Sequence, residues 1–284
     1  MRVLLIGSSG MLGTDIRNEW TTDEIIPATS KDADIRDLVQ VRALLARTKP
    51  DWVVLSAAYT DVDGSEKNKE TAFAVNGTGT ENVAQAATEA KAKLFYVSTD
   101  YVFDGTSSRP YETTDKINPV NVYGASKAAG EKAIQDNARD WIIGRTSWLF
   151  GASGSSFPEK ILQAAATRPE LKVVADQIGS PTFTRDLAAA IRDLIKKDAR
   201  GMMHITNSGS CSWCDFAKEI LRQAGRGIPV HPITTAEAAR LAKRPANSIL
   251  SPASLNAEGI HLRNWQDAVG AYLAEMKSIG KLSS

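Results

Sequence analysis

Residues 1–13, MRVLLIGSSGMLG, join a short apolar run to three glycines, and this junction decides the fold. The run Val3–Ile6 predicts a buried strand, and Gly7, Gly10 and Gly13 follow it before a helix that continues through Trp20. Glycines at such a turn let the backbone approach a pyrophosphate at the positive end of a helix. Their spacing departs from the better-known G-x-G-x-x-G motif, so the strand–turn–helix context carries the prediction of a nucleotide cradle. A plain glycine turn is the alternative.

Further apolar runs, rich in β-branched residues, alternate with segments of helical period. The runs are 52–55, 94–97, 141–143 and 172–174, and the clearest helical segments between them are 36–48, 71–91 and 124–137. Such alternation predicts a parallel sheet with crossover helices.

From about Gly151 the sequence GASGSSF predicts a loop that leaves the sheet. Helices are expected beyond it near 157–167, 184–197, 214–224 and 264–277. We therefore expect an α/β fold with a Rossmann-like, doubly wound parallel sheet over residues 1–150. A smaller, mainly helical substrate-binding lobe would occupy 151–284, made discontinuous by a return of about 172–198 to the first part.

Composition and charge limit the classes of partner. The chain is 43% hydrophobic and 24% charged, with a formal net charge of +1, so no overall field recruits nucleic acid or a membrane surface. The first apolar run is too short for a signal peptide or a membrane span. Cys211 and Cys214 are the only cysteines, which provides no disulfide framework and favours a reducing, cytoplasmic setting.

The expected end of the second strand, IIPATSK, bears on the choice of cofactor. NAD-specific proteins often place an acid there to bind the adenosine ribose, and this stretch has none. Thr29, Ser30 and Lys31 offer hydroxyls and a cation that suit a 2′-phosphate, so NADPH is the preferred cofactor, with NADH an alternative. Asp34 is a further candidate for the adenine side.

Residues 123–127, YGASK, place a phenol four residues ahead of an ammonium. On a helix, Tyr123 and Lys127 would share one face, with Cβ atoms about 5–6 Å apart. A neighbouring cation stabilises a phenolate, so we expect Lys127 to lower the pKa of Tyr123. The expected fourth strand also delivers Ser98, Thr99 and Asp100 to the sheet edge that carries the glycine turn.

Together, the glycine turn, the hydroxyl at a strand end and Tyr-x-x-x-Lys resemble the extended short-chain dehydrogenase/reductase superfamily. More narrowly, the chain from Met1 to about Trp265 resembles the dTDP-4-dehydrorhamnose reductase family. The stretches that carry this likeness are STDYVFDG, NPVNVYGASKAAGE, GRTSWLFG, DQIGSPT and RPANSIL.

The resemblance implies a role for each matching residue. Tyr123 would be the proton donor, Lys127 would hold the nicotinamide ribose, and Thr99 would hydrogen-bond the C4 carbonyl. The resemblance implies cofactor contacts from Gly10, Met11, Leu12, Asp34, Ile35, Ala57, Ala58 and Tyr59, beside Gly7, Gly13, Ser30 and Lys31 from the glycine turn and the end of the second strand. Thr99, Asp100 and Trp148 would contact a nucleotide-sugar.

The implied reaction is reduction of dTDP-4-dehydro-L-rhamnose at C4 by NADPH, giving dTDP-L-rhamnose. The resemblance also leaves open a homodimer and a divalent ion such as Mg²⁺, for which we assign no ligands. Three departures from the family pattern stand out: Leu55–Ala58 read LSAA where the family usually has Asn-Ala-Ala-Ala, Phe150 replaces Tyr, and Cys211 replaces Thr.

Other functions fit parts of the same pattern. Dehydratases of the superfamily generally place glutamate after Thr-Asp, whereas Tyr101 follows Asp100 here. Epimerases and other 4-ketosugar reductases remain open. A non-catalytic NADP-binding regulatory subunit, like the beta subunit of methionine adenosyltransferase, is the alternative from another class, and intact Thr99, Tyr123 and Lys127 favour the enzyme.

Several isolated signals have plainer interpretations. The spacing C-x-x-C at Cys211 and Cys214 predicts two cysteines that cap a helix in the substrate lobe, in preference to a redox pair or a zinc site. The histidines His204, His231 and His261 lack metal-ligand spacing. Asp63 and Glu66 are expected to cap a helix, and Trp148 is either a sugar contact or a core aromatic.

Overall fold

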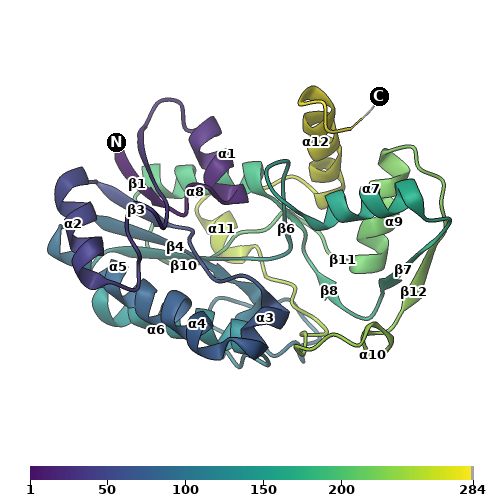
Figure 1. The fold of residues 1–284 in the computed structure, drawn as a ribbon, viewed down its shortest axis with the longest axis horizontal. Coiled ribbons are helices and arrows are strands. Elements are labelled where there is room, and N and C mark those ends of the chain that lie inside the picture. Colours follow the sequence, from purple (N-terminus) through teal and green to yellow (C-terminus); the bar gives the residue numbers. More distant parts are fainter. Residues whose placement is uncertain (283–284) are drawn as a thin grey trace.

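Six parallel strands form the central sheet of the computed structural model, which describes residues 1–282 (Figure 1). The strands are β1 (Arg2–Ile6), β2 (Glu24–Ala28), β3 (Trp52–Leu55), β4 (Lys93–Thr99), β5 (Trp141–Thr146) and β10 (Gly201–His204), in the order β10-β5-β4-β3-β1-β2. Their parallel registers place Ile6 beside Leu55, and Thr99 beside Thr146, at the carboxyl edge. The expected doubly wound sheet is confirmed, and β10, which the sequence patterns did not reveal, adds its sixth strand.

Helices cover both faces of this sheet because the strands alternate apolar side chains between the two faces. Val3 and Leu5 pack in one core with α1 (Met11–Glu19) and α8 (Thr184–Lys196). Leu4 and Ile6 pack in the other core, against α2 (Leu38–Thr48), α5 (Thr80–Glu89) and α6 (Val122–Asn137). Full burial of such side chains stabilises the fold by about 1.5–3 kcal/mol each.

The expected helix 71–91 is interrupted by a wider turn. After α3 (Val62–Lys67), the chain forms α4 (Lys69–Phe73), a π-helical stretch at Ala74–Gly79, and α5. A short 3₁₀ turn at Asp100–Val102 similarly ends β4. Local departures of this kind often mark functional positions, and both lie near the pocket described below.

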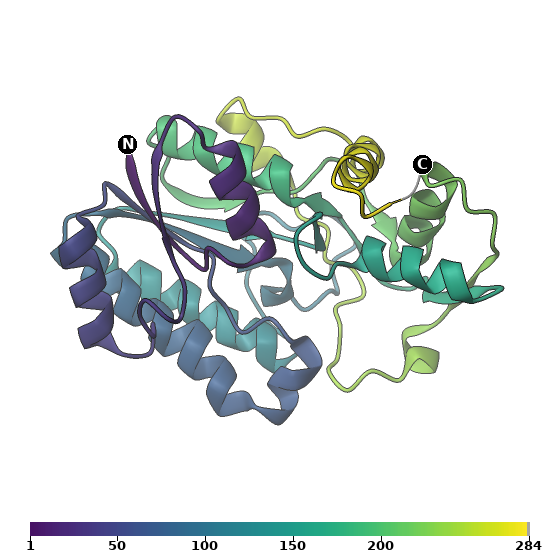
Figure 2. The same cartoon turned by 45° about the horizontal axis from the view of Figure 1, so that its top comes forward.

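A third core belongs to the smaller lobe, drawn on the right of Figures 1 and 2. Its main helices are α7 (Phe157–Thr167), α9 (Trp213–Gln223) and α12 (Trp265–Ser278), with shorter α10 (Thr235–Ala238). Its strand pairs are β6 (Leu149–Phe150) with β9 (Thr182–Phe183), β7 (Leu171–Val174) with β12 (Val230–Ile233), and β8 (Ile178–Gly179) with β11 (Cys211–Ser212). Helix α11 (Ala253–Ala257) packs back against β10 of the large sheet.

Residues 172–198 do not behave as one unit. Strand β7 pairs with β12, because Leu171 and Val173 are buried in the core of the lobe, and it does not join the large sheet as expected. Helix α8 does return, burying Leu187 and Ile191 against α1. We propose a division in which the chain crosses back to the sheet at the start of α8.

The two cysteines are packing residues in the lobe. Cys211 and Cys214 are both buried, their thiols are free, and burial raises the pKa of the Cys211 thiol. The helix cap is Ser212 instead, whose hydroxyl oxygen accepts a hydrogen bond from the backbone N–H of Asp215 at 3.0 Å. The sequence expectation of cysteine caps was therefore wrong.

None of the helices described within residues 1–282 has the length and apolar character needed to cross a bilayer.

Candidate active site

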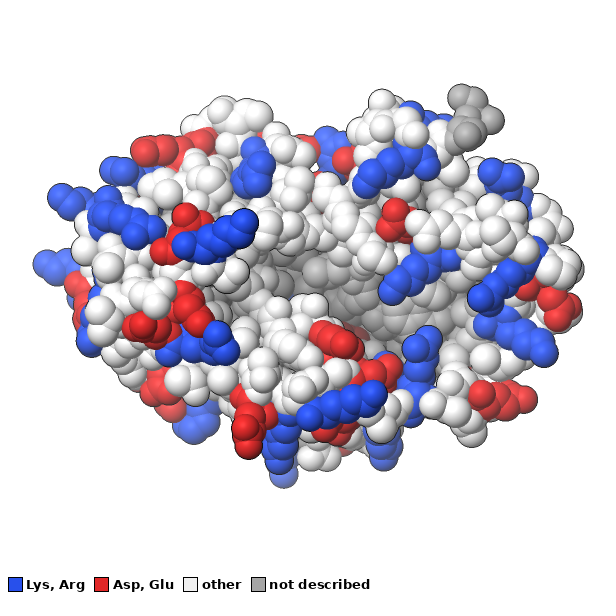
Figure 3. All heavy atoms as spheres, in the orientation of Figure 1, with Lys and Arg blue, Asp and Glu red and all other residues white. Residues whose placement is uncertain are grey.

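A pocket of about 970 Å³ lies along the carboxyl edge of the sheet, between the sheet and the smaller lobe. Figure 3 shows a hollow at the middle of this face, with acidic and basic side chains scattered around it. The residues that line it come from the ends of β1, β3, β4 and β5, and from the lobe segment 146–160 with Trp213. Ligands of doubly wound sheets bind at this edge.

The glycine turn forms one end of the pocket and fits a pyrophosphate. Gly7 has a φ of +96°, and a Cβ there would lie 2.5 Å from the backbone nitrogen of Ala57. A Cβ at Gly13 would collide with the carbonyl oxygen of Gly7. Helix α1 begins at Met11 with no side chain capping it, so a bound anion would meet the uncapped positive end of a helix.

The expected adenine end contains a cation that the sequence reasoning missed. Of the residues expected there, Ser30, Asp34 and Ile35 line the pocket and Lys31 does not, and Arg36 lines it as well. Arg36 donates to both carboxylate oxygens of Asp34, at 2.6–3.0 Å, and this pairing lowers the pKa of Asp34. The sequence signal for this ion pair is that an acid, Asp34, and a base, Arg36, are two positions apart.

The hydroxyl of Thr29 already makes a hydrogen bond within its own loop. It donates to the carboxylate of Asp32 at 2.9 Å, and the backbone N–H of Thr29 donates to the same oxygen at 2.8 Å. An acid therefore does lie beside the end of β2, although it comes later in the chain than the stretch IIPATSK. It is held by local hydrogen bonds and is not among the residues that line the pocket.

The stretch after β3 lines the middle of the pocket through Ala57 and Ala58. Ser56, at one of the departures from the family pattern, donates its hydroxyl to the carbonyl oxygen of Ile6 at 3.1 Å and so ties β3 to β1. Tyr59 does not line the pocket. Its backbone N–H and carbonyl both bond to the buried amide of Asn76, which lies in the π-helical stretch and was not singled out from the sequence.

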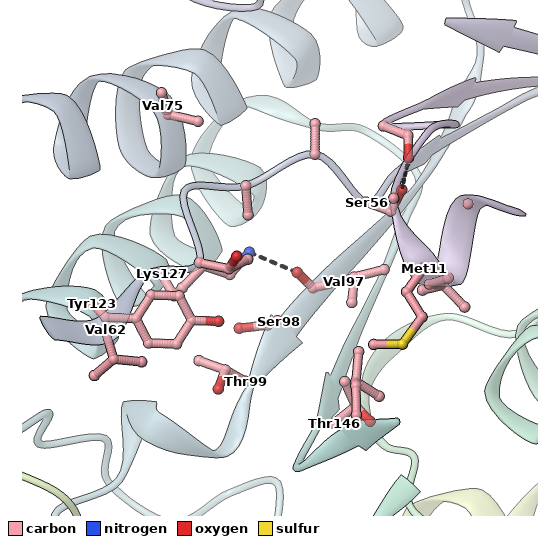
Figure 4. A pocket seen from close by; sticks show the side chains of 18 of the residues that line it. Met11, Ser56, Val62, Val75, Val97, Ser98, Thr99, Tyr123, Lys127 and Thr146 are labelled. Atoms are coloured by element: carbon pink, nitrogen blue, oxygen red, sulfur yellow. Dashed lines mark hydrogen bonds between the residues drawn. The ribbon is translucent and has the colours of Figure 1, made fainter. Parts of the chain in front are cut away.

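Tyr123 and Thr99 meet in this pocket (Figure 4). Tyr123 lies in the first turn of α6, where Asn121 caps the helix by accepting from the backbone N–H of Gly124 at 2.7 Å. Figure 4 shows the Tyr123 hydroxyl pointing toward Ser98 and Thr99. Burial raises the pKa of Tyr123 to about 12, an effect that the Thr99 hydroxyl opposes.

Lys127 is one turn further along α6 and is buried. Its ammonium donates to the carbonyl oxygen of Val97 at 2.7 Å and lies 4.0 Å from the ring centroid of Tyr96. Burial lowers the pKa of Lys127 to about 7, and the carboxylate of Glu131 opposes this. The pKa of Tyr123 is raised and not lowered, so that prediction is wrong: Lys127 bonds to a backbone carbonyl instead.

Asp100 is a buried carboxyl beneath the two hydroxyls. Burial raises its pKa to about 7, while hydrogen bonds from Ser248 and Thr99 act in the opposite direction. Thr99 donates to Asp100 Oδ1 at 3.1 Å. The carboxyl of Asp100 is therefore expected to be about half protonated near neutral pH.

A buried ion pair between Glu131 and Arg145 lies behind the strand end that carries Ser98 and Thr99. Glu131 accepts from Arg145 at 2.7 and 2.9 Å and from the Ser98 hydroxyl at 2.6 Å. Each side chain of the ion pair is only 3% exposed. The neighbouring His204 in β10 is buried, which together with the charge of Arg145 lowers its pKa to about 3, so its imidazole is neutral. This network links β4, β5 and α6 and fixes the end of β4 that carries Thr99.

Aromatic side chains form the wall on the lobe side. Trp148, with a φ of +47°, stacks on Trp213 with ring centroids 3.6 Å apart, and Phe157 packs against Trp213. The opposite edge of Trp148 lies over Gly179, where a Cβ would come within 2.5 Å of the indole. Trp148 is thus both a packing residue and a pocket residue. The sequence patterns had not pointed to Trp213 or Phe157.

Asp63 and Glu66 were expected to cap a helix, but each bonds to another part of the chain instead. Asp61 caps α3, whereas Asp63 pairs with Arg244, and Glu66 accepts the backbone N–H of Val122 at the start of α6. Across residues 1–282, no group of three or more His, Cys, Asp or Glu side chains is arranged to hold a metal ion.

Comparison with known proteins assigns the family. The family described as RmlD substrate binding domain matches residues 1–278. The chain is 40% identical to the spore coat polysaccharide biosynthesis protein SpsK of Bacillus subtilis, over 98% of both chains. It is 37% identical to a dTDP-4-dehydrorhamnose reductase of Burkholderia thailandensis, over 98% of this chain and all of that one. It is also 36% identical to a dTDP-4-keto-6-deoxy-D-glucose reductase of Streptomyces niveus, over 94% of this chain and 95% of that one.

A solved structure agrees with these relatives. The dTDP-4-dehydrorhamnose reductase of Bacillus anthracis, solved in complex with NADP, superposes with a TM-score of 0.95 at 38% identity, covering 96% of this chain and 99% of that one. The glycine turn, the strand end with Thr99 and the helix with Tyr123 therefore lie in a fold shared over nearly the whole chain. The chain belongs to the RmlD substrate binding domain family, a family of NAD(P)H-dependent oxidoreductases.

Proposed function

We propose that this chain reduces the C4 ketone of dTDP-4-dehydro-L-rhamnose to give dTDP-L-rhamnose, with NADPH as the reductant. The observation that carries the proposal is the meeting of the Tyr123 and Thr99 side chains in a pocket whose other end is the glycine turn. A proton donor and a hydrogen-bond donor then face the position where a ketone would approach the cofactor.

The residues present fit a nicotinamide dinucleotide. Gly7, Gly10 and Gly13 leave the space that a pyrophosphate needs, and Ala57 and Ala58 leave room beside it. When bound, the reduced nicotinamide supplies a hydride. At the adenine end, Arg36 offers a planar guanidinium that suits a 2′-phosphate, which supports NADPH over NADH.

Two residues of the chain, Thr99 and Tyr123, would stabilise the negative charge that develops on the sugar oxygen. Thr99 would donate a hydrogen bond to the C4 oxygen, and Tyr123 would donate a proton as negative charge develops there. With a pKa raised to about 12, the phenol of Tyr123 is protonated at neutral pH and so has a proton to donate. A well-placed acid contributes about 10²–10⁴ in rate.

Lys127 would hold the nicotinamide ribose, as the family resemblance implies. Its ammonium already lies at the end of β4, bonded to Val97, so it would have to share or exchange that partner. Asp100 and Trp148 line the pocket on the side expected to bind the nucleotide-sugar.

A second substrate is favoured by one relative. The Streptomyces niveus protein is described as a dTDP-4-keto-6-deoxy-D-glucose reductase and is nearly as similar as the dTDP-4-dehydrorhamnose reductases. The same Tyr123 and Thr99 would serve either ketone, since both substrates carry the carbonyl at C4.

The homodimer, the divalent ion and the cytoplasmic location stay predictions. Sedimentation with and without Mg²⁺ tests the homodimer and the divalent ion.

The test is a panel of dTDP-linked and UDP-linked 4-ketosugars, assayed with NADPH and NADH by loss of nicotinamide absorbance. We expect fastest turnover with dTDP-4-dehydro-L-rhamnose and NADPH. Replacement of Tyr123 by Phe should lower kcat by at least about 10²-fold while cofactor binding persists. Turnover of no 4-ketosugar, together with a co-purifying partner protein, would favour the regulatory-subunit alternative.

A further inference from the structure

A segment of the lobe crosses back over the pocket-forming strands and touches both parts of the protein. We call residues 240–248, RLAKRPANS, the interdomain strap. The backbone N–H of Ser248 donates to the carbonyl oxygen of Ile178 in β8 at 2.9 Å, while the N–H of Asn247 donates to the carbonyl oxygen of Gly105, beyond β4, at 3.2 Å. The strap therefore connects β8, where Gly179 underlies Trp148, to the segment after Thr99 and Asp100.

The strongest side-chain contact of the strap is with α3. The guanidinium of Arg244 donates to the two carboxylate oxygens of Asp63 at 2.7 and 2.9 Å, and the backbone N–H of Ala242 donates to the same carboxylate at 2.9 Å. The Arg244 side chain is only 14% exposed. A forked, largely buried pair of this kind fixes orientation as well as distance. Arg240, by contrast, is exposed and lies 4.0 Å from Asp63.

The same guanidinium reaches the proton donor through one intervening side chain. The charge of Arg244 acts on the buried Tyr101 hydroxyl, where it opposes the rise in the pKa of Tyr101 that burial causes. The ring of Tyr101 lies edge-on to the ring of Tyr123, with centroids 5.7 Å apart and planes at 75°. Such T-shaped pairs are directional, so a shift of Tyr101 is transmitted to Tyr123.

The strap also contacts the helix that carries Tyr123. The side-chain amide of Asn121 donates to the carbonyl oxygen of Lys243 at 2.8 Å, while its oxygen caps α6 by accepting from Gly124. Tyr123 is thus bounded on one side by Tyr101 and Arg244. On the other side it is held by a helix cap that bonds to the next residue of the strap.

We propose that Arg244 is a positioning residue, through which the substrate lobe sets the orientation of Tyr123 for proton transfer. The inference rests on the proposed function, because it gives Tyr123 the role of proton donor. Catalytic geometry is sensitive: a displacement of about 1 Å at the reacting groups costs up to about 10² in rate. The contacts of the strap are with α3, α6, β8 and the segment after β4, away from the glycine turn, so cofactor binding should be independent of them.

The experiment uses the full-length chain and compares Arg244→Met, Arg244→Lys, Tyr101→Phe and the double variant Arg244→Met/Tyr101→Phe. Arg240→Met is the matched control, since it removes an exposed arginine of the same strap. For each variant we would measure kcat, the KM for the ketosugar, the Kd for NADPH and the thermal midpoint.

We expect Arg244→Met to lower kcat by about 10–100-fold, with the Kd for NADPH changed by less than about twofold. Arg244→Lys should recover part of the loss. The double variant should be no slower than the slower single variant, because the two residues act in series. Arg240→Met should retain the native kcat. A lowered thermal midpoint with native kcat in Arg244→Met, or losses that multiply in the double variant, would overturn the proposal.

A second readout does not depend on the substrate. Hydrogen exchange of the backbone amides in 121–126 should accelerate in Arg244→Met and remain native in Arg240→Met, because the strap holds the first turn of α6. If the native chain reduces no 4-ketosugar, the proposed function fails while this measurement still reports on the strap. Unchanged exchange in Arg244→Met would overturn the coupling itself.

Discussion

The ammonium of Lys127 donates a 2.7 Å hydrogen bond to the carbonyl oxygen of Val97, and not to the phenol four residues before it on the same helix. The i and i+4 positions do share a face of α6, as the sequence suggested. The ammonium instead satisfies a carbonyl at the end of β4 and lies against the ring of Tyr96. The amine of Lys127 therefore lies beside the strand end and does not acidify Tyr123.

Removing this charge should affect cofactor binding and turnover together. In Lys127→Met the side chain keeps most of its volume but loses the ammonium that would hold the nicotinamide ribose. We expect weaker NADPH binding by fluorescence titration and a kcat lowered by about 10²-fold or more. Lys132→Met, on the exposed side of the same helix, is the control. Native affinity in Lys127→Met would contradict the assigned role.

The pH dependence of stability should expose the buried carboxyl of Asp100. Because its pKa is raised from 3.8 to about 7, the folded chain holds this proton more tightly than the unfolded chain does. Both states are protonated below about pH 4. Stability is then lost as the pH rises toward 7, and the full cost, of order 4 kcal/mol, is present above that pH.

Asp100→Asn should therefore have little effect on the free energy of unfolding near pH 4. Above pH 7 it should stabilise the chain relative to the native one, because the amide keeps an acceptor for Thr99 without a charge. Urea unfolding at pH 4, 5.5, 7 and 8 measures the difference. Asp136→Asn, on the surface of α6, is the control. A difference that did not vary with pH would refute the raised pKa.

Arg36 should decide part of the preference for NADPH. It lines the adenine end of the pocket, and its removal leaves Asp34 there as an unpaired carboxylate. In Arg36→Gln we expect the KM for NADPH to rise by about tenfold, because a 2′-phosphate would lose its cation, with little change for NADH. The control is Arg42→Gln, whose arginine pairs with Glu89 outside the pocket. Equal changes for both cofactors would exclude a role in 2′-phosphate recognition.

The ion pair between Glu131 and Arg145 should matter for folding. Both side chains are 3% exposed, so Glu131→Gln leaves a buried guanidinium without its counter-charge. Breaking such a pair typically costs about 3–5 kcal/mol. We expect a clearly lower denaturation midpoint in urea, whereas Lys132→Gln, which breaks an exposed pair one residue later, should remain close to native. A native midpoint in Glu131→Gln would show that the site relaxes or takes up water.

Some features were readable because they depend on neighbours in the chain. The strand at Val3–Ile6 and the glycine turn after it are local, since apolar alternation and the freedom of glycine act over a few residues. The same holds for the helix that places Tyr123 and Lys127 on one face. The family likeness extended these local patterns over nearly the whole chain, and the match over residues 1–278 confirmed it.

Other features depended on which distant residues meet. Strand β10 has a weak pattern of its own and is recognisable only through its pairing with β5. Arg36 lines the pocket and Lys31 does not, and the path of the loop after β2, which the sequence does not reveal, decides which of the two does. The sequence predicted that Asp63 caps a helix, whereas in the structure it pairs with Arg244, which lies 181 positions later in the chain.

The sequence by itself therefore determined the glycine turn after the first strand and the helix that carries Tyr123 and Lys127 on one face. Only the tertiary structure decided the protonation of these groups and the contacts that orient them. The physical reason is that burial and through-space charge set a pKa, and both depend on residues brought together by folding. Lys127, Asp100 and Tyr123 each have an ordinary side chain in the sequence and a shifted pKa in the pocket.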